Sequence, residues 1–235
     1  MVPTSEPRQK LSRDKIVEAA LQVMDTEGLE AVSMRRVARE VGVEAMSLYH
    51  HVTDKEDLLR GVCDKIMGGF EFATGGGTWA ERMRAVAHSW RRLLRVHPDV
   101  MRLFAITHGP SPSSPESLQP TEFALRLIRD AGISDRDTVQ AFHAFGGYIQ
   151  GFVMMEGGSI KGGHDPEVHD VFASEVDAAA FPMLHLVSRY FSECGADEQF
   201  EFGLDLMIRG LEARAADGSS ADARRHDAAS VGPQP

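Results

Sequence analysis

The run of residues 32–55 constrains the fold more than any other part of this chain. It is typical of two short helices joined at Gly42, because glycine adopts at little cost the left-handed backbone that ends a helix. Val37 and Ala38 precede the turn, and Leu48 follows it by six residues. The small alanine lets the second helix cross close over the first, and the leucine fills the shared core. This spacing predicts a helix-turn-helix, with an ordinary helical hairpin as the alternative.

The outward side of the second helix favours DNA as the partner. Its residues are short or hydrogen-bonding, unlike the Lys/Glu mixture of a merely solvated face, and such groups suit a helix that enters a major groove. Cationic side chains stand where backbone phosphates would run, on the first helix and after the second. The outward residues are Ala45, Met46, Ser47, Tyr49, His50 and His51, and the cations are Arg35, Arg36, Arg39 and Lys55.

Residues 11–66 resemble the N-terminal domain of the TetR family of bacterial transcriptional repressors. The most specific match is the run Leu-Tyr-x-His-Val-x-x-Lys-x-x-Leu-Leu, which is intact from Leu48 to Leu59. In the tetracycline repressor branch Gln and Pro stand at the positions of Ala45 and Met46, so these departures concern the operator sequence and not the act of binding. The predicted DNA-binding residues are Ser33, Met34, Arg35, Ala45, Met46, Ser47, Tyr49, His50, His51 and Lys55.

Length and composition allow a small domain and a larger one. The chain has 235 residues, 43% of them hydrophobic, and two cysteines with no CxxC spacing, which predicts reduced thiols. No apolar run approaches the roughly 18 residues of a membrane span, and no charged-then-apolar leader opens the chain. We therefore expect a cytoplasmic protein.

Because the formal net charge is −10, the prediction of DNA binding depends on a local excess of positive side chains. Residues 1–70 hold ten Lys/Arg against twelve Asp/Glu, so the acidic remainder should repel DNA from every other surface. The N-terminal arm and the first helix carry four cations, Arg8, Lys10, Arg13 and Lys15. The arm fits a disordered solubilising tail as well as a minor-groove or phosphate contact.

The remaining pattern predicts an all-α fold, because no segment shows the period-2 alternation of a strand. Gly75-Gly-Gly77 marks the boundary between an arm and DNA-binding domain at 1–72 and a helical effector-binding and dimerisation domain at 78–215; a disordered tail is expected at 216–235. Capping boxes are predicted at 53–56 and 78–81. Helices are predicted at 12–27, 55–72, 79–96, 99–106, 121–131, 134–156, 171 or 175–194 with a kink at Pro182, and 197–215, with a loop at 108–115.

Two of these helices are apolar on more than one face. In 134–156 one stripe holds Phe142, Phe145, Ile149 and Phe152, and the glycines at 146, 147 and 151 indicate either close approach of another group or a break in the helix. In 197–215 one face holds Phe200, Leu204, Met207 and Leu211, with Phe202, Leu206 and Ile208 beyond it.

A terminal helix apolar on two faces suggests a partner subunit. Residues 200–206 and 210–212 also resemble the end of the C-terminal domain in the tetracycline-repressor branch. This resemblance implies a homodimer formed by helices 134–156 and 197–215 as a four-helix bundle. A dimer would space two recognition helices roughly 34 to 36 Å apart on palindromic double-stranded DNA.

The same resemblance implies an effector pocket among the helices at 79–96, 99–106, 121–131 and 134–156. Val86 and Phe104 stand where that branch has an Asn and a magnesium-binding His, which argues against tetracycline and magnesium and for a more apolar small molecule. The candidate effector-binding residues, each of which also fits plain core or loop, are Trp90, Phe104, Thr107, His108, Phe142 and Glu156.

Three other classes of protein fit parts of the pattern: a helical metal or redox sensor, a small-molecule-binding helical enzyme, and a dimeric scaffold with a vestigial head. The chain has ten histidines but no HExxH and no G-x-S-x-G. We therefore predict no metal, no cofactor and no catalytic residue. The sequence favours a ligand-responsive repressor that binds its operator as a dimer and is released by a small apolar effector.

Overall fold

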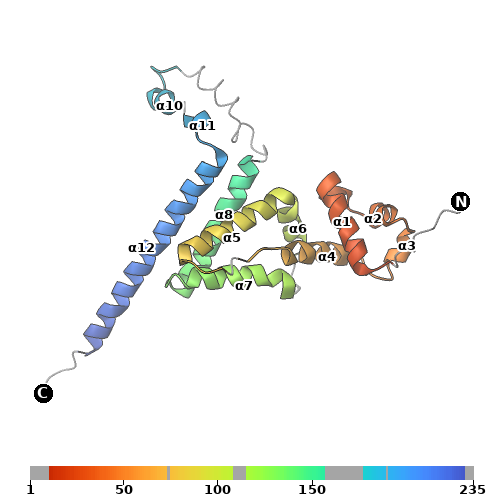
Figure 1. The fold of residues 1–235 in the computed structure, drawn as a ribbon, viewed down its shortest axis with the longest axis horizontal. Coiled ribbons are helices and arrows are strands. Elements are labelled where there is room, and N and C mark those ends of the chain that lie inside the picture. The colour runs from red at the N-terminus through yellow and green to blue at the C-terminus, as the bar shows by residue number, and fades with distance from the viewer. Residues whose placement is uncertain (1–10, 73–74, 108–114, 157–176, 189, 231–235) are drawn as a thin grey trace. The chain divides into compact units, whose positions relative to one another are not determined.

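The computed structural model describes residues 11–72, 75–107, 115–156, 177–188 and 190–230, and this part of the chain is helical without a strand. The predicted all-α fold is confirmed (Figure 1). Among the helices of the described segments, none is both long and apolar enough to cross a bilayer. The chain forms two compact units, residues 1–70 with 96–121 and residues 71–95 with 122–235.

The first unit is built around α1. Helix α1 packs on α2 and α4, α3 packs on α2, and α6 packs on α4. Ile16, Leu48, Leu58 and Leu103 are fully buried in this unit. Its elements are α1 (Arg13–Glu27), η1 (Leu29–Ala31), α2 (Met34–Val41), α3 (Ala45–Leu48), α4 (Lys55–Gly68) and α6 (Val100–Thr107).

Helix ends in the first unit follow local side-chain chemistry. Gly28 ends α1 with φ 87°, as glycine's freedom at positive φ allows. The capping box predicted at 53–56 is displaced by one residue, because the Asp54 carboxylate accepts the amide of Asp57 at 2.8 Å. Helix α4 ends at Gly68 and not at residue 72. A second glycine, Gly69, follows, and two successive glycines disfavour continuation of the helix.

The second unit contains most of α5, part of α7, and all the later helices. The capping box predicted at 78–81 is confirmed: the Thr78 amide donates to the Glu81 carboxylate at 2.7 Å, and the Glu81 amide donates to Thr78 Oγ1 at 3.2 Å. The elements are α5 (Trp79–Val96), α7 (Pro115–Arg129), α8 (Asp135–Glu156), α10 (Pro182–Val187), α11 (Tyr190–Glu193) and α12 (Ala196–Ser230).

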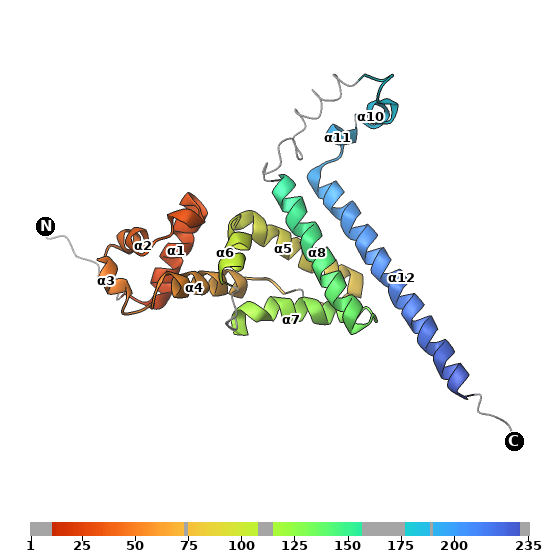
Figure 2. The same ribbon diagram turned by 180° about the vertical axis from the view of Figure 1, so that it is seen from behind.

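Helices α8 and α12 pack antiparallel, and α12 continues past the start of α8 (Figures 1 and 2). Arg214 pairs with Asp137 at 2.8 Å near one end of α8, while Tyr148 stacks on Phe200 toward the other. Most residues of the predicted apolar stripes form this contact, but Phe142 and Met207 are only half-buried, and Ile208, which was predicted to lie beyond the stripe of α12, is buried in place of Met207. Phe145, Ile149, Phe152, Phe200, Leu204, Ile208 and Leu211 are buried.

Further predicted features differ from the structure. Helix α7 begins at Pro115, because a proline at the first position is pre-organised for a helix, and it continues through Pro120. Pro182 likewise begins α10 and does not kink a longer helix. Helix α8 runs unbroken through its three glycines, which excludes a break in the helix, one of the two alternatives. Helix α12 continues to Ser230, into the residues where a disordered tail was expected.

Candidate DNA interface and effector domain

The turn between α2 and α3 has the geometry that its sequence predicts. Gly42 adopts φ 71° and ψ 36°, and the next amide, that of Val43, donates to the Ala38 carbonyl at 3.0 Å. This hydrogen bond closes the end of α2. Ala38 is 2% exposed and Leu48 is fully buried between the two helices. The structure therefore confirms the helix-turn-helix.

The outward side of α3 carries two exposed large side chains. Met46 is 72% exposed and Tyr49 is 47% exposed, although both are apolar enough to be buried in an ordinary hairpin. Ser33 has a structural task as well, because its hydroxyl accepts the Arg36 amide at 3.2 Å and caps α2. The other predicted DNA-binding residues are exposed (Arg35, His50, Lys55) or partly buried (Met34, Ala45, Ser47, His51).

The cations near this face fall into two groups. Arg35, Arg39 and Lys55 are exposed and form no ion pair within the described part of the chain. Arg36 differs, because its guanidinium is paired with Glu27 at 2.5 Å and with Glu40 at 2.7 Å, and these hydrogen bonds raise its pKa. The sequence alone does not predict that Arg36 is paired and Arg35 is not, since the ion pair of Arg36 with Glu27 depends on where α1 lies.

A clasp formed by Arg13, His51 and Asp57 holds the end of the recognition segment. The Arg13 guanidinium donates to the His51 carbonyl at 3.2 Å and to both Asp57 carboxylate oxygens at 2.7 and 2.9 Å. Asp57 also accepts the Thr53 amide at 2.8 Å. The Arg13 hydrogen bond, followed by the Thr53 amide, lowers the pKa of Asp57 to about 2. Arg13, which sequence analysis grouped with the DNA-facing cations, thus links α1 to α3 and α4.

The candidate effector residues divide between the two units. Phe104 and Thr107 belong to the first unit, and Trp90, Phe142 and Glu156 to the second. Thr107 is buried, donates to the Leu103 carbonyl at 2.9 Å and is hydrogen-bonded to the Cys63 thiol. Burial raises the pKa of Cys63 to about 11, so little of this thiol is ionised near neutral pH. His108 lies outside the described residues.

A buried ion pair in the second unit was missed by the sequence analysis. The Arg91 guanidinium is held by Glu156, with Nε donating to a carboxylate oxygen at 2.9 Å, and also by Asp197 at 2.7 Å. It lies over the Phe200 ring at 4.5 Å from the centroid. Arg91 occurs on the apolar stripe of α5 between Ala87 and Leu94, and a lone arginine on such a stripe was the available signal.

Glu156, one of the predicted effector residues, is therefore paired with Arg91 within the protein. No group of three or more His, Cys, Asp or Glu side chains that could hold a metal ion occurs among the described residues.

Comparison with known proteins identifies both parts of the chain. Residues 16–62 match the model of bacterial regulatory proteins of the tetR family, and residues 73–215 match the tetracyclin repressor-like C-terminal domain. The HTH-type transcriptional repressor DrrR1 of Streptomyces coeruleorubidus is 33% identical over 227 residues, covering 91% of this chain and 82% of that protein. The tetracycline repressor protein class E of Escherichia coli is 27% identical and covers 87% of this chain and 92% of that protein.

Solved structures agree with these matches. Apo ActR from Streptomyces coelicolor has a TM-score of 0.73 at 30% identity and covers 91% of this chain and all of that chain. ActR in complex with actinorhodin has a TM-score of 0.71 at 30% identity over 88% of this chain and 99% of that chain. The sensor, enzyme and scaffold alternatives are not favoured. The chain belongs to the TetR family of bacterial regulatory proteins and is a ligand-responsive, DNA-binding transcriptional repressor, not an enzyme.

Proposed function

We propose that this repressor acts in the cytoplasm as a homodimer that reads a palindromic operator with its ten predicted DNA-binding residues. The observation that supports it best is the exposure of Met46 and Tyr49, 72% and 47%, on a helix whose opposite side is closed by Leu48. Exposing such side chains is costly in water but favourable against thymine methyl groups and sugar edges in a groove. Arg35 and Arg39 on α2 and Lys55 at the start of α4 are exposed cations that form no ion pair within the described residues.

The DNA part of the proposal is tested on the DNA that flanks the protein's own gene. We expect a salt-sensitive complex with a palindrome in fluorescence anisotropy, weakened at least about tenfold by Tyr49→Ala, which corresponds to about 1.4 kcal/mol. Tyr49→Phe separates the hydroxyl from the ring. Arg60→Ala is the matched control, since Arg60 pairs with Glu56 on α4 at 2.7 Å. Equal binding by Tyr49→Ala and Arg60→Ala would overturn the assignment.

TetR-family repressors typically act as dimers, and we propose that α8 and α12 form the interface here. Phe202 and Leu206 lie one helical turn apart on α12 and are 67% and 58% exposed, while Val139 on α8 is 49% exposed. Gly147 on α8 and Gly210 on α12 have nothing within 4 Å of a would-be Cβ. Exposed apolar side chains and open glycines on two packed helices suit a second pair of helices laid against them.

The double substitution Phe202→Asp with Leu206→Asp tests this interface. We expect a dimer for the unmodified protein and a monomer for the variant in sedimentation analysis, because two carboxylates would be buried without partners. Glu212→Lys, an exposed change on the same helix, should leave the dimer intact. A dimeric double variant with an unchanged helical circular dichroism spectrum would exclude this interface.

We further propose that the effector is a small, largely apolar organic molecule that contacts some of the six predicted effector residues. ActR, which is 30% identical, has been solved with actinorhodin, and actinorhodin is therefore the first probe. The effector can displace DNA only through its preference for the protein state that binds DNA poorly.

Tryptophan fluorescence can locate such a ligand, because the chain has two tryptophans, Trp79 and Trp90. The indole of Trp79 donates to the Leu127 carbonyl and serves a structural role. In Trp79→Phe protein, we expect quenching of Trp90 on titration with the probe and release of operator over the same concentrations. Quenching in Trp90→Phe protein but not in Trp79→Phe protein would exclude Trp90 from the site.

A further inference from the structure

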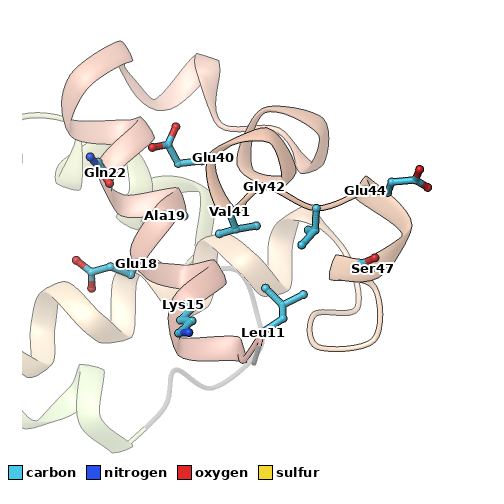
Figure 3. A pocket seen from close by; sticks show the side chains of 11 residues that line it. Leu11, Lys15, Glu18, Ala19, Gln22, Glu40, Val41, Gly42, Glu44 and Ser47 are labelled. Carbon is cyan, nitrogen blue, oxygen red and sulfur yellow. The ribbon is translucent and has the colours of Figure 1, made fainter. Parts of the chain in front are cut away.

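A groove of about 750 Å³ crosses the first unit beside the helix-turn-helix. It runs between the side of α1 and the turn that joins α2 to α3 (Figure 3). Its floor is apolar, with half-buried Leu11, Val41 and Val43. Ser47, one of the predicted DNA-binding residues, lies at one end. The groove therefore adjoins the DNA-binding face without being part of it.

The rim of the groove is acidic. Glu18, Glu40 and Glu44 lie around its edge in Figure 3, against a single cation, Lys15. Glu18 pairs with Lys65 and Glu40 with Arg36, whereas Glu44 has no ion pair within the described part of the chain. Glu44 is also the N-cap residue of α3, yet its side chain makes no capping hydrogen bond. Since Lys65 and Arg36 offset Glu18 and Glu40, Glu44 is the carboxylate of the rim that remains for a cationic polypeptide, and its charge disfavours DNA phosphates.

The chain itself supplies a segment with the matching chemistry. Residues 1–10 end at Lys10, directly before Leu11 of the groove floor. They carry Arg8 and Lys10 against one acid, Glu6. They also carry Val2 and two prolines, which suit an apolar floor and lose little entropy on ordering. Ten extended residues reach roughly 33 Å, enough to follow a groove of this size.

We propose that residues 1–10 dock in this groove in the DNA-free protein, with the apolar residues on the floor and Arg8 paired with Glu44. Docked there, the arm places its positive charge beside the first residue of the recognition helix. It offsets a carboxylate that would otherwise repel phosphates at this edge of the DNA-binding face. The arm then serves neither as a simple solubilising tail nor as an independent minor-groove reader.

A spin label on the arm tests the docking without DNA. In full-length dimeric protein with Cys194→Ser, a nitroxide is attached at Ser5→Cys; Cys63 does not compete, because it is buried with a pKa of about 11. Paramagnetic broadening of backbone amides then reports where the arm lies. We expect strong broadening at Gln22 and Val43, which line the groove, and little at Lys55.

Charge reversal identifies the contact. Glu44→Lys should lower the docked-to-undocked ratio by roughly two- to fivefold, the range for one exposed ion pair, and adding Arg8→Glu should restore it. Asp14→Lys is the matched control, since Asp14 is an exposed acid near the arm that does not line the groove. Broadening absent from the groove, or equal effects of Glu44→Lys and Asp14→Lys, would overturn the proposal. Because no DNA is present, failure here leaves the operator-binding proposal untouched.

Discussion

Asp57 shows how one side chain can govern the position of the recognition segment. Its carboxylate joins α1 through Arg13 and accepts the Thr53 amide in the loop before α4. The folded-state pKa of about 2 lies below the ordinary value of 3.8. A depressed carboxyl pKa stabilises the folded state fully above the unfolded pKa, and this stabilisation is lost as the pH falls toward the folded pKa.

Asp57→Asn should therefore destabilise the protein in a pH-dependent way. Above about pH 4 we expect a loss of about 1 to 2 kcal/mol relative to the unmodified protein, because charge-assisted hydrogen bonds to Arg13 are weakened. The difference should shrink between about pH 4 and pH 2, where the native carboxyl is protonated. Denaturant unfolding across this range measures it. Glu56→Gln, whose pair with Arg60 is exposed, should show little loss, and a pH-independent gap for Asp57→Asn would contradict the argument.

At the scale of helices, the packing of α8 against α12 includes a close approach of Tyr148 to Gly203. The Tyr148 hydroxyl donates to the Phe200 carbonyl at 2.9 Å, and a Cβ at Gly203 would collide with this hydroxyl and its ring. Burial also raises the pKa of Tyr148, so its hydroxyl stays protonated and can donate. The space for Tyr148 is therefore set by the glycine on the facing helix.

Gly203→Ala should destabilise the protein by about 1 to 3 kcal/mol, because overpacking outweighs the gain in helix propensity. Gly68→Ala, in the last turn of α4 with open space around it and away from the proposed dimer interface, should be neutral or stabilising by up to about 1 kcal/mol. Thermal unfolding monitored by circular dichroism compares the two variants. A stabilised Gly203→Ala protein would show that Tyr148 relocates freely.

The pair of Arg91 and Glu156 gives a second prediction at this scale. Arg91→Met should cost about 3 kcal/mol, because it leaves the Glu156 carboxylate, 11% exposed, without its main partner. Adding Glu156→Gln should recover much of this loss, since the remaining group is neutral. A double-mutant cycle in denaturant measures the coupling energy. Additive losses would mean that the two side chains are stabilised independently.

At the scale of the whole molecule, an acidic protein must bind a polyanion against its own net charge, and we propose that exposed cations of the head carry this binding. The net charge is −10, and ion pairing within the head leaves Arg35 available while Arg36 is held by Glu27 and Glu40. Each phosphate contact contributes about −0.9 to the slope of log K against log salt concentration. We therefore expect Arg35 to contribute to this slope and the paired Arg36 not to contribute.

Arg35→Ala should flatten the salt dependence of operator binding by about 1.8 per dimer, two contacts at about 0.9 each. Arg36→Ala should leave the slope nearly unchanged. Anisotropy titrations at several salt concentrations give both slopes. A larger change for Arg36→Ala than for Arg35→Ala would mean that the Glu27 and Glu40 pairs open on DNA.

The local sequence determined the elements whose causes lie within a few residues. The Gly42 turn, the Thr78–Glu81 capping box and most residues of the apolar stripes of α8 and α12 were predicted correctly, because turn chemistry and helical periodicity act over one or two turns. The start of α7 was wrong because a proline can begin a helix as well as exclude one. The predicted domain limits and site residues remain predictions.

Only the tertiary structure decided how charged groups are paired. Arg13 and Asp57 are 44 residues apart and Arg91 and Glu156 are 65 apart, and no local pattern indicates that such residues meet. The exposed Arg35 and the paired Arg36 are neighbours of the same type in the chain. Their difference arises from the position of Glu27 on another helix, because an ion pair depends on distance in space and not on distance along the sequence.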